Sequence, residues 1–184
     1  MRTGLIIVDM QNDYFAGGNM ELVRMEAAAA NASRLLAHFR NEGQPFYHVQ
    51  HLSIRPGATF FLPGTPGAEI HETVKPKAGE PVVRKHFPNA FRETTLLETV
   101  RKDGVEHLVI CGAMSHMCID ATTRAAFDLG FKCTVIEDAC ATRDLSFQGE
   151  RVAAADVHVA FMAALSVPYA SVVSTKDFMS TIQS

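Results

Sequence analysis

Gly4-Leu5-Ile6-Ile7-Val8-Asp9 is a short apolar run, rich in β-branched residues, that ends abruptly at a carboxylate. Such a run is typical of a strand covered on both faces, as in a parallel sheet. A second run of this kind covers residues 106–112, and a helix is predicted just after it, over residues 116–129. Cys118 would lie in the first turn of that helix, where exposed N–H groups and the positive end of the helix dipole favour a reactive thiolate.

Strand signals alternate with helix signals along the chain. The predicted strands cover residues 4–8, 45–50, 81–84, 106–112, 132–137 and 170–174. The predicted helices cover residues 20–41, 92–103, 116–129 and 149–165. This alternation indicates an α/β fold of Rossmann-like type, with a six-stranded parallel sheet in the order 3-2-1-4-5-6 and helices on both faces, in three layers. We expect residues 1–184 to form a single domain.

The bulk composition is that of a globular protein acting on a small molecule. The chain has 184 residues, a formal net charge of -3 and 47% hydrophobic residues. This charge offers no basic surface to nucleic acid or to an anionic membrane, and no apolar run has the length of a membrane span or a signal peptide core. The four cysteines show neither a CxxC pair nor the spacing of a disulfide scaffold, so we expect reduced thiols and a cytoplasmic location. The expected partner is a small-molecule substrate, with no nucleic acid and no membrane.

Three residues that can perform chemistry follow the ends of separate predicted strands. Asp9 follows the first strand, Lys85 the third and Cys118 the fourth. Taken singly, Asp9 is equally well explained as a cap for the next turn, Lys85 better as a solvated charge, and Cys118 better as a core residue. In a doubly wound sheet, however, ligands bind beyond the carboxyl ends of the strands. The joint placement of the three residues therefore predicts a catalytic site.

An acid, an amine and a thiol together can activate sulfur. The carboxylate takes the thiol proton, the nearby ammonium stabilises the thiolate, and the thiolate attacks a carbonyl carbon. The same carboxylic acid can protonate a departing amine and then activate water against the thioester. Backbone N–H groups around residues 114–118 are suited to hold the oxyanion. Hydrolysis of an amide is the natural outcome.

A long stretch rich in proline and glycine, residues 52–80, interrupts the regular pattern. A loop of this length is usually functional or disordered, and its apolar centre favours either an ordered flap over the site or a subunit contact, with neither preferred. The substrate pocket is expected to be largely apolar. Its predicted residues are Tyr14, Phe15, Phe60, Phe61, Phe87 and His116.

The histidines raise the question of a metal site. His48 and His51 form the obvious pair, but their odd spacing on a strand sends them to opposite faces, so they cannot easily share one ion. His71, in the long loop, could join one of them, yet no Asp-x-His accompanies it. We predict no metal and no cofactor.

Three motifs resemble those of the isochorismatase-like cysteine hydrolase superfamily, and the resemblance covers nearly the whole chain. The motifs are IVDMQNDYF at residues 7–15, KHFPNAF at 85–91 and GAMSHMCIDATTR at 112–124. The resemblance implies a catalytic triad in which Asp9 is the general acid and base, Lys85 supports the thiolate and Cys118 is the nucleophile. It also implies a cis bond between Ala113 and Met114, with the N–H groups of Met114 and Cys118 as the oxyanion hole.

Proteins similar to this chain hydrolyse small amides, including nicotinamide, carbamoyl amines and ureido compounds, and some hydrolyse the vinyl ether of isochorismate. The metal-binding nicotinamidases carry an Asp-x-His after the second strand, where this chain has Val49-Gln50-His51-Leu52-Ser53. The vinyl ether reaction needs no covalent nucleophile, so retention of Cys118 favours cleavage of a C–N bond. The leading hypothesis is therefore a metal-independent hydrolase that cleaves a small amide, carbamoyl or ureido compound through a Cys118 thioester. The alternatives are a vinyl ether hydrolase, a nicotinamidase, a thiol redox sensor and a catalytically silent partner-binding domain.

The predicted last helix is apolar over much of its circumference, from residue 152 to residue 165. Burial in a subunit interface explains this pattern, although an ordinary core explains it nearly as well. Together with the resemblance, the pattern predicts a homodimer or a larger homo-oligomer.

Overall fold

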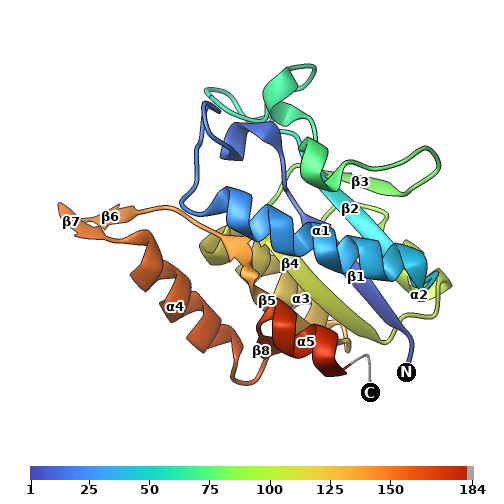
Figure 1. The fold of residues 1–184 in the computed structure, drawn as a ribbon. Helices are drawn as coiled ribbons and strands as arrows, with labels where there is room; N and C mark the ends of the chain where they lie inside the picture. Colours follow the sequence, from blue (N-terminus) through green and yellow to red (C-terminus); the bar gives the residue numbers. More distant parts are fainter. Residues whose placement is uncertain (182–184) are drawn as a thin grey trace.

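Six parallel strands form the central sheet of the computed structural model, which describes residues 1–181 (Figure 1). The strands follow the order β3-β2-β1-β4-β5-β8. Their bounds are Thr3–Val8 (β1), Phe46–His51 (β2), Val82–Lys85 (β3), His107–Ala113 (β4), Lys132–Ala141 (β5) and Ser171–Val173 (β8). The predicted order 3-2-1-4-5-6 is confirmed, because β6 and β7 form a separate hairpin and β8 is the sixth strand of this sheet.

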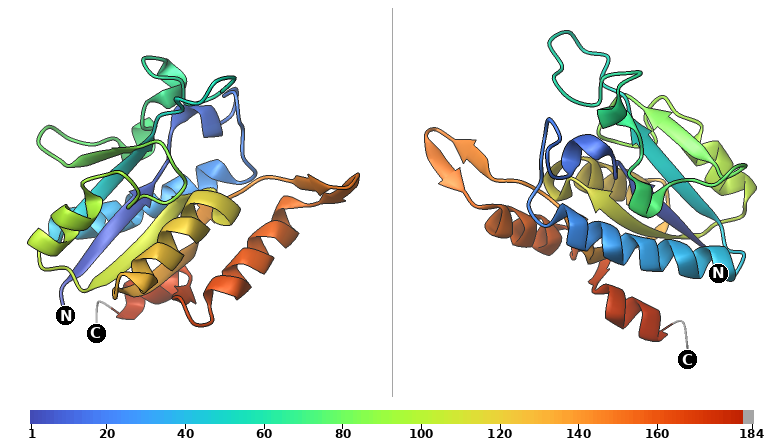
Figure 2. Two further views of the ribbon diagram at one scale, coloured as in Figure 1. Left: turned by 180° about the vertical axis from the view of Figure 1, so that it is seen from behind. Right: turned by 45° about the horizontal axis from the view of Figure 1, so that its top comes forward.

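Helices cover both faces of the sheet, which gives three layers (Figure 2). One face carries α1 (Met25–Asn41) and α5 (Thr175–Thr181), which contact β5 and each other. The other face carries α2 (Leu96–Lys102), α3 (Asp120–Asp128) and α4 (Ala154–Leu165). No helix among the residues that the structure describes is long and apolar enough to cross a membrane.

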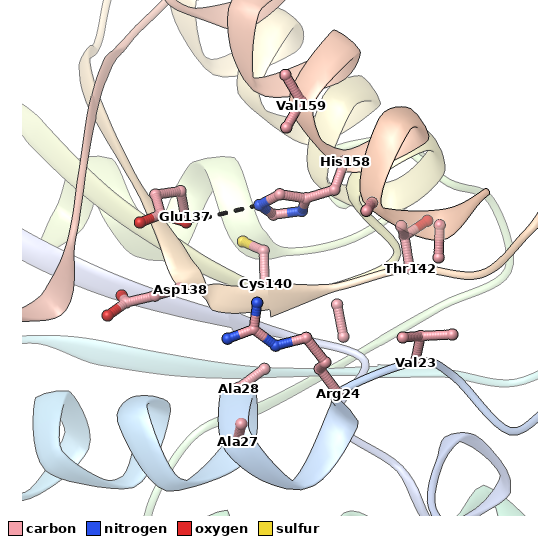
Figure 3. Close-up of a pocket in the computed structure, with 13 residues that line it drawn as sticks. Val23, Arg24, Ala27, Ala28, Glu137, Asp138, Cys140, Thr142, His158 and Val159 are labelled. Carbon is pink, nitrogen blue, oxygen red and sulfur yellow. Dashed lines mark ion pairs between the residues drawn. The ribbon is translucent and has the colours of Figure 1, made fainter. Parts of the chain in front are cut away.

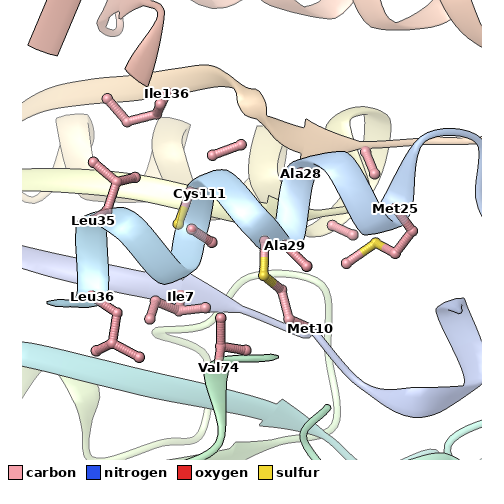
Figure 4. Packing of buried hydrophobic residues seen from close by; sticks show 14 of the residues in the cluster. Ile7, Met10, Met25, Ala28, Ala29, Leu35, Leu36, Val74, Cys111 and Ile136 are labelled. Carbon is pink, nitrogen blue, oxygen red and sulfur yellow. The ribbon is translucent and has the colours of Figure 1, made fainter. Parts of the chain in front are cut away.

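Successive residues of β1 belong to opposite layers. Leu5 and Ile7 pack in the core beneath α1, whereas Ile6 and Val8 pack in the core beneath α2 and α3. Figure 4 shows the first of these cores, where side chains of α1 meet the sheet. Burial on both faces explains why this strand is continuously apolar rather than alternating. The strand therefore packs against both helical layers, and Asp9 follows directly after its last residue.

Three predicted helices begin later than expected, since 92–103 is observed as α2 from Leu96 and the other two start five residues late. The prediction of 20–41 is wrong at its start, because the Val23 N–H donates to the Thr142 carbonyl at 2.9 Å and Arg24 has a φ of 61°. The prediction of 149–165 is also wrong at its start, since β6 (Leu145–Phe147) and β7 (Glu150–Val152) form a hairpin there. The helix that follows, α4, starts where the Asp144 carboxylate accepts the Ala154 N–H at 2.8 Å.

Candidate active site

The carboxyl edge of the sheet brings the three predicted catalytic residues together. Asp9 follows β1, Lys85 ends β3 and Cys118 lies in the turn after β4. All three are buried: Asp9 and Lys85 are 0% exposed and Cys118 is 5% exposed. A charged pair so deeply buried is costly unless its members are matched, so this arrangement points to a use beyond stability.

The Lys85 ammonium is the centre of the cluster. Its Nζ lies 2.7 Å from Asp9 Oδ2 and 3.2 Å from Cys118 Sγ. It also lies 3.1 Å from the Phe87 carbonyl oxygen and 2.9 Å from Nδ1 of His51. His51 was not predicted as a site residue. Its signal was its place at the end of β2, where it is the register partner of Lys85 in β3.

The backbone around Cys118 departs from a regular helix. The segment Ser115–Ile119 is a single π-helical turn, followed by α3. The Met114 carbonyl accepts the N–H groups of Met117 and Ile119, at 3.0 and 3.2 Å. In a regular α-helix the Met114 carbonyl would accept the Cys118 N–H. In this π turn it accepts the Ile119 N–H instead, so the Cys118 N–H is not used by that carbonyl. The predicted helix over 116–129 thus begins as a π turn.

Close packing between β1 and β4 fixes the start of this turn. Gly112 has a φ of 128°, and a Cβ placed there would lie 2.0 Å from the Val8 carbonyl oxygen. Only glycine fits such an approach. The next peptide bond, between Ala113 and Met114, is cis, as the resemblance implies.

The environment of Cys118 favours the thiol rather than the thiolate. Burial raises the pKa of Cys118 most, the Asp9 carboxylate raises it further, and the Lys85 ammonium lowers it. The sequence led us to expect helix N–H groups to favour the thiolate, whereas burial of this sulfur acts in the opposite direction and raises its pKa. Burial also opposes the charge of Lys85, but Asp9 and Cys118 outweigh it and raise the pKa of this amine. The Cys118 thiol therefore needs a base to remove its proton before the sulfur can react as a thiolate.

Asp9 is placed to be that base. Its carboxylate, the Cys118 sulfur and a ring nitrogen of His51 lie within 4.8 Å of one another. Within residues 1–181, both Asp9 carboxylate oxygens are buried without a hydrogen-bond donor, although Oδ2 lies 2.7 Å from Lys85 Nζ. A buried oxygen of this kind is costly and is free to accept the thiol proton.

The same atoms could be mistaken for a metal site. Asp9, His51 and Cys118 supply the oxygen, nitrogen and sulfur that a transition metal prefers. Each of them, however, contacts the Lys85 ammonium, which already places a positive charge between them. The donor set therefore does not fit a metal ion. His48 lies apart from this cluster, 3.4 Å from Glu80, in accord with the predicted opposite faces.

A cavity of about 450 Å³ opens above the cluster. Its wall includes four of the six predicted pocket residues, namely Tyr14, Phe60, Phe61 and Phe87. The other side chains of the wall were not predicted as pocket residues, although His86, Pro88, Met114 and Met117 lie in the motifs quoted above and Met114 was predicted for the oxyanion hole. These other side chains are His51, Ser53, Ile54, Arg55, His86, Pro88, Met114 and Met117. Cys118 completes the lining, so the thiol faces the space where a small molecule can bind.

Two predicted pocket residues lie elsewhere. Phe15 is stacked on His71, with ring centroids 3.5 Å apart, and does not line the cavity. His116 hydrogen-bonds through Nδ1 with Thr142 Oγ1 at 2.6 Å, and its ring faces Phe161 of α4. The cause is the π turn, which places His116 on the α4 side of the turn rather than beside the sulfur.

The long loop, residues 52–80, is held over the cavity by side chains that follow β1. Asp13 Oδ2 accepts the Phe61 N–H at 2.6 Å. Gln11 Nε2 donates to the Ala68 carbonyl at 2.8 Å, and its amide group also bonds both backbone groups of His51. The segment is therefore fixed to its own chain beside the cavity.

A second cavity of about 280 Å³ lies between the start of α1, the end of β5 and α4 (Figure 3). Cys140 and Asp138 face it from β5, and Arg24 faces it from the start of α1. His158 of α4 pairs with Glu137, with Nε2 and Oε2 3.6 Å apart. This cavity also holds a thiol, a histidine and carboxylates.

The first cavity and the buried acid, amine and thiol beneath it are the arrangement of a hydrolase, here on a three-layer α/β fold. The isochorismatase domain model matches residues 3–177, and the chain belongs to the isochorismatase family. The family consists of hydrolases, among them amidohydrolases that act on C–N bonds.

Known proteins agree with this assignment. The isochorismatase family protein YddQ of Bacillus subtilis strain 168 is 51% identical over 179 residues, which cover 97% of this chain and 99% of that protein. The crystal structure of an isochorismatase from Pseudomonas putida KT2440 is 39% identical, with a TM-score of 0.88, over 96% of this chain and 89% of that one. A streptothricin hydrolase of Streptomyces noursei is 38% identical over 142 residues, which cover 77% of this chain and 50% of that protein.

Proposed function

We propose that this protein is a metal-independent amidohydrolase that cleaves a C–N bond of a small amide, carbamoyl or ureido compound through a thioester on Cys118. The observation that carries the proposal is the position of the Lys85 ammonium, which lies within 3.2 Å of both Asp9 and Cys118 beneath the cavity. The family contains amidohydrolases, and a relative at 38% identity is named streptothricin hydrolase.

The proposed reaction has two halves. Asp9 takes the Cys118 proton, the thiolate attacks the carbonyl carbon, and the N–H groups of Met114 and Cys118 hold the oxyanion. The C–N bond then breaks, and Asp9 returns its proton to the departing nitrogen. Water next attacks the thioester and gives a proton to Asp9, and the released thiolate regains that proton. Lys85 keeps its charge throughout and stabilises each thiolate.

The cavity wall suggests the shape and charge of the substrate. Tyr14, Phe60, Phe61 and Phe87 favour a flat or apolar acyl group. Asp9 and Lys85 neutralise each other, so Arg55 is the fixed charge left on the wall. Among residues 1–181, the Arg55 guanidinium has no hydrogen bond and no ion pair. A substrate with a carboxylate would supply the missing partner, whereas an ammonium would be repelled.

The decisive experiment is intact-protein mass spectrometry after brief incubation with a panel of small amides, while ammonia release is followed in parallel. The wild type is compared with Cys118→Ala. We expect a transient acyl adduct on the wild type alone, together with ammonia. An adduct on neither protein, with no ammonia from any amide, would refute the thioester route.

Three of the alternative functions can be compared with the site. A redox sensor needs an accessible thiolate, whereas Cys118 is 5% exposed and burial raises its pKa. A vinyl ether hydrolase needs no thiol, so turnover of such a substrate by Cys118→Ala would favour it. A metal-dependent nicotinamidase would lose activity to a chelator, whereas we expect full activity in its presence because Lys85 occupies the centre of the donor set.

Assembly and location are part of the proposal. The exposed side of α4 is apolar, with Val159 65% exposed, which supports a homodimer or larger homo-oligomer. The four cysteines, all within residues 1–181, are free, which supports a cytoplasmic location. Sedimentation velocity tests the first of these statements.

A further inference from the structure

More hydrogen-bond acceptors surround the Lys85 ammonium than it has N–H groups to donate. It carries three N–H groups and no acceptor. Four atoms lie within hydrogen-bond distance of Nζ: Asp9 Oδ2, His51 Nδ1, the Phe87 carbonyl oxygen and Cys118 Sγ. All four can accept a proton from an ammonium, so four acceptors compete for three N–H groups. By geometry the hydrogen bonds run to His51, Phe87 and Cys118, while within residues 1–181 Asp9 Oδ2 forms a close ion pair without a hydrogen bond.

This count fixes the tautomer of His51. Because Lys85 can only donate, Nδ1 of His51 must accept, and the ring proton must lie on Nε2. Burial, followed by the charge of Lys85, lowers the pKa of His51 to about 4, so the ring is neutral near neutral pH. Gln11 holds the residue in place by bonding both its backbone N–H and its carbonyl.

We infer that His51 is a positioning residue that takes one Lys85 proton through Nδ1 and presents its own Nε2–H to the substrate. While His51 accepts one Lys85 N–H, the Cys118 sulfur competes with Asp9 and Phe87 for the remaining two and depends on Asp9 for its ionisation. When the thiol proton passes to Asp9, one Lys85 N–H turns from the protonated carboxyl to the new thiolate. The thiolate is thus stabilised mainly after the base has acted.

The other side of the ring defines a requirement on the substrate. His51 lines the cavity, and within residues 1–181 its Nε2–H has no acceptor. The substrate class is therefore one with a hydrogen-bond acceptor beside the scissile carbonyl, such as a second carbonyl or a carboxylate oxygen. This part of the inference rests on the proposed function, whereas the partition of the Lys85 protons does not.

Two variants of similar size separate the two roles of the ring. His51→Leu removes the acceptor for Lys85, and His51→Asn replaces it with Oδ1. The alkylation rate of Cys118 by iodoacetamide is measured from neutral to alkaline pH by peptide mass spectrometry. We expect His51→Leu to lower the thiol pKa and speed alkylation about tenfold at mildly alkaline pH, because a free Lys85 N–H then turns to sulfur. His51→Asn should follow the wild type in this assay.

The remaining cysteines provide the control for folding. Cys111 and Cys140 are buried, so in an intact variant they should stay as slow to alkylate as in the wild type. Equal rates for all three proteins at Cys118, or equal acceleration in both variants, would overturn the inference. With a substrate in hand, His51→Asn should raise KM more than it lowers kcat, and the reverse would overturn the role of Nε2–H. If the alkylation result holds and no amide is hydrolysed, the proton partition stands and the proposed function fails.

Discussion

Both cavities have a buried cysteine and a histidine in their walls, with carboxylates in the wall of the second and the Asp9 carboxylate beneath the first, yet the two thiols lie in different electrostatic environments. Cys118 faces the first with Asp9 and His51 nearby, and Cys140 faces the second with Asp138 and His158 nearby. Burial raises the pKa of both thiols, that of Cys140 to about 12. The difference is the cation, because Lys85 lowers the pKa of Cys118, whereas the lowering influence on Cys140 is a backbone N–H of Gly112. A buried ammonium favours the thiolate of a neighbouring cysteine, and of these two cysteines Cys118 is the one beside Lys85.

The largest expected difference between the two cavities is in turnover. Cys118→Ala should lower kcat at least about a thousandfold on the best amide of the panel, because the covalent step is lost. Cys140→Ala should keep kcat within about twofold, since its thiol has no ammonium to activate it. Initial rates on both variants test this. A comparable loss in Cys140→Ala would mean that the second cavity takes part in the reaction.

The second difference is in stability. Lys85→Met leaves the Asp9 carboxylate buried without its partner and should lower the free energy of unfolding by about 3–5 kcal/mol. The matched change in the second cavity, His158→Leu, should cost less, about 1–2 kcal/mol. The ion pair with Glu137 is partly exposed (21% and 40%), and the buried Ser115 hydroxyl loses His158 Nδ1 but keeps the Ala141 carbonyl as acceptor.

Urea unfolding measures both changes. The double variant Asp9→Asn/Lys85→Met is the control, and it should recover most of the loss seen in Lys85→Met, because no charge remains buried. No recovery would show that the loss comes from packing of the lysine stem rather than from the uncompensated carboxylate.

The pH dependence of stability provides the third difference. The pKa of His51 is about 4 in the folded protein, below its ordinary value near 6.5. Between these two values the unfolded chain binds a proton at His51 and the folded chain does not, so stability falls as the pH falls. The loss should approach roughly 3 kcal/mol at pH 4 and vanish above pH 6.5.

Subtracting the stability of His51→Asn from that of the wild type at each pH isolates this effect. The variant lacks the titrating ring and keeps an acceptor for Lys85. A difference that is constant from pH 4 to pH 7 would show that His51 is protonated as easily in the folded as in the unfolded chain.

The sequence was a good guide to the sheet and to the clustering of three buried side chains because both depend on local signals. Continuous apolar runs predicted the buried parallel strands, and Asp9, Lys85 and Cys118 each come after such a run. His51 also ends a strand, but its contact with Lys85 depends on the register of β2 and β3, and the place of Arg55 in the cavity wall depends on the path of a loop.

The misplacement of His116 and Phe15 has a similar cause. Both stand close in sequence to predicted site residues, but a π turn sends His116 toward Thr142, and stacking on His71 draws Phe15 away. Side-chain direction at an irregular turn depends on which carbonyl accepts which N–H, and a residue pattern does not encode that choice.

The smallest expected difference concerns the arginines of the two cavities. Arg55 lines the first and Arg24 lines the second. Arg55→Gln should raise KM for a carboxylate-bearing amide about fivefold and leave KM for a neutral amide of the same shape unchanged, because an exposed charge-assisted hydrogen bond contributes about 1 kcal/mol. Arg24→Gln should change neither value. Higher salt should weaken binding of the charged substrate to the wild type and not to Arg55→Gln, since screening acts on the pair that the variant has already lost. An equal rise in KM for both substrates would instead indicate that Arg55 holds the loop in shape, and the preference for an anionic substrate would then be without support.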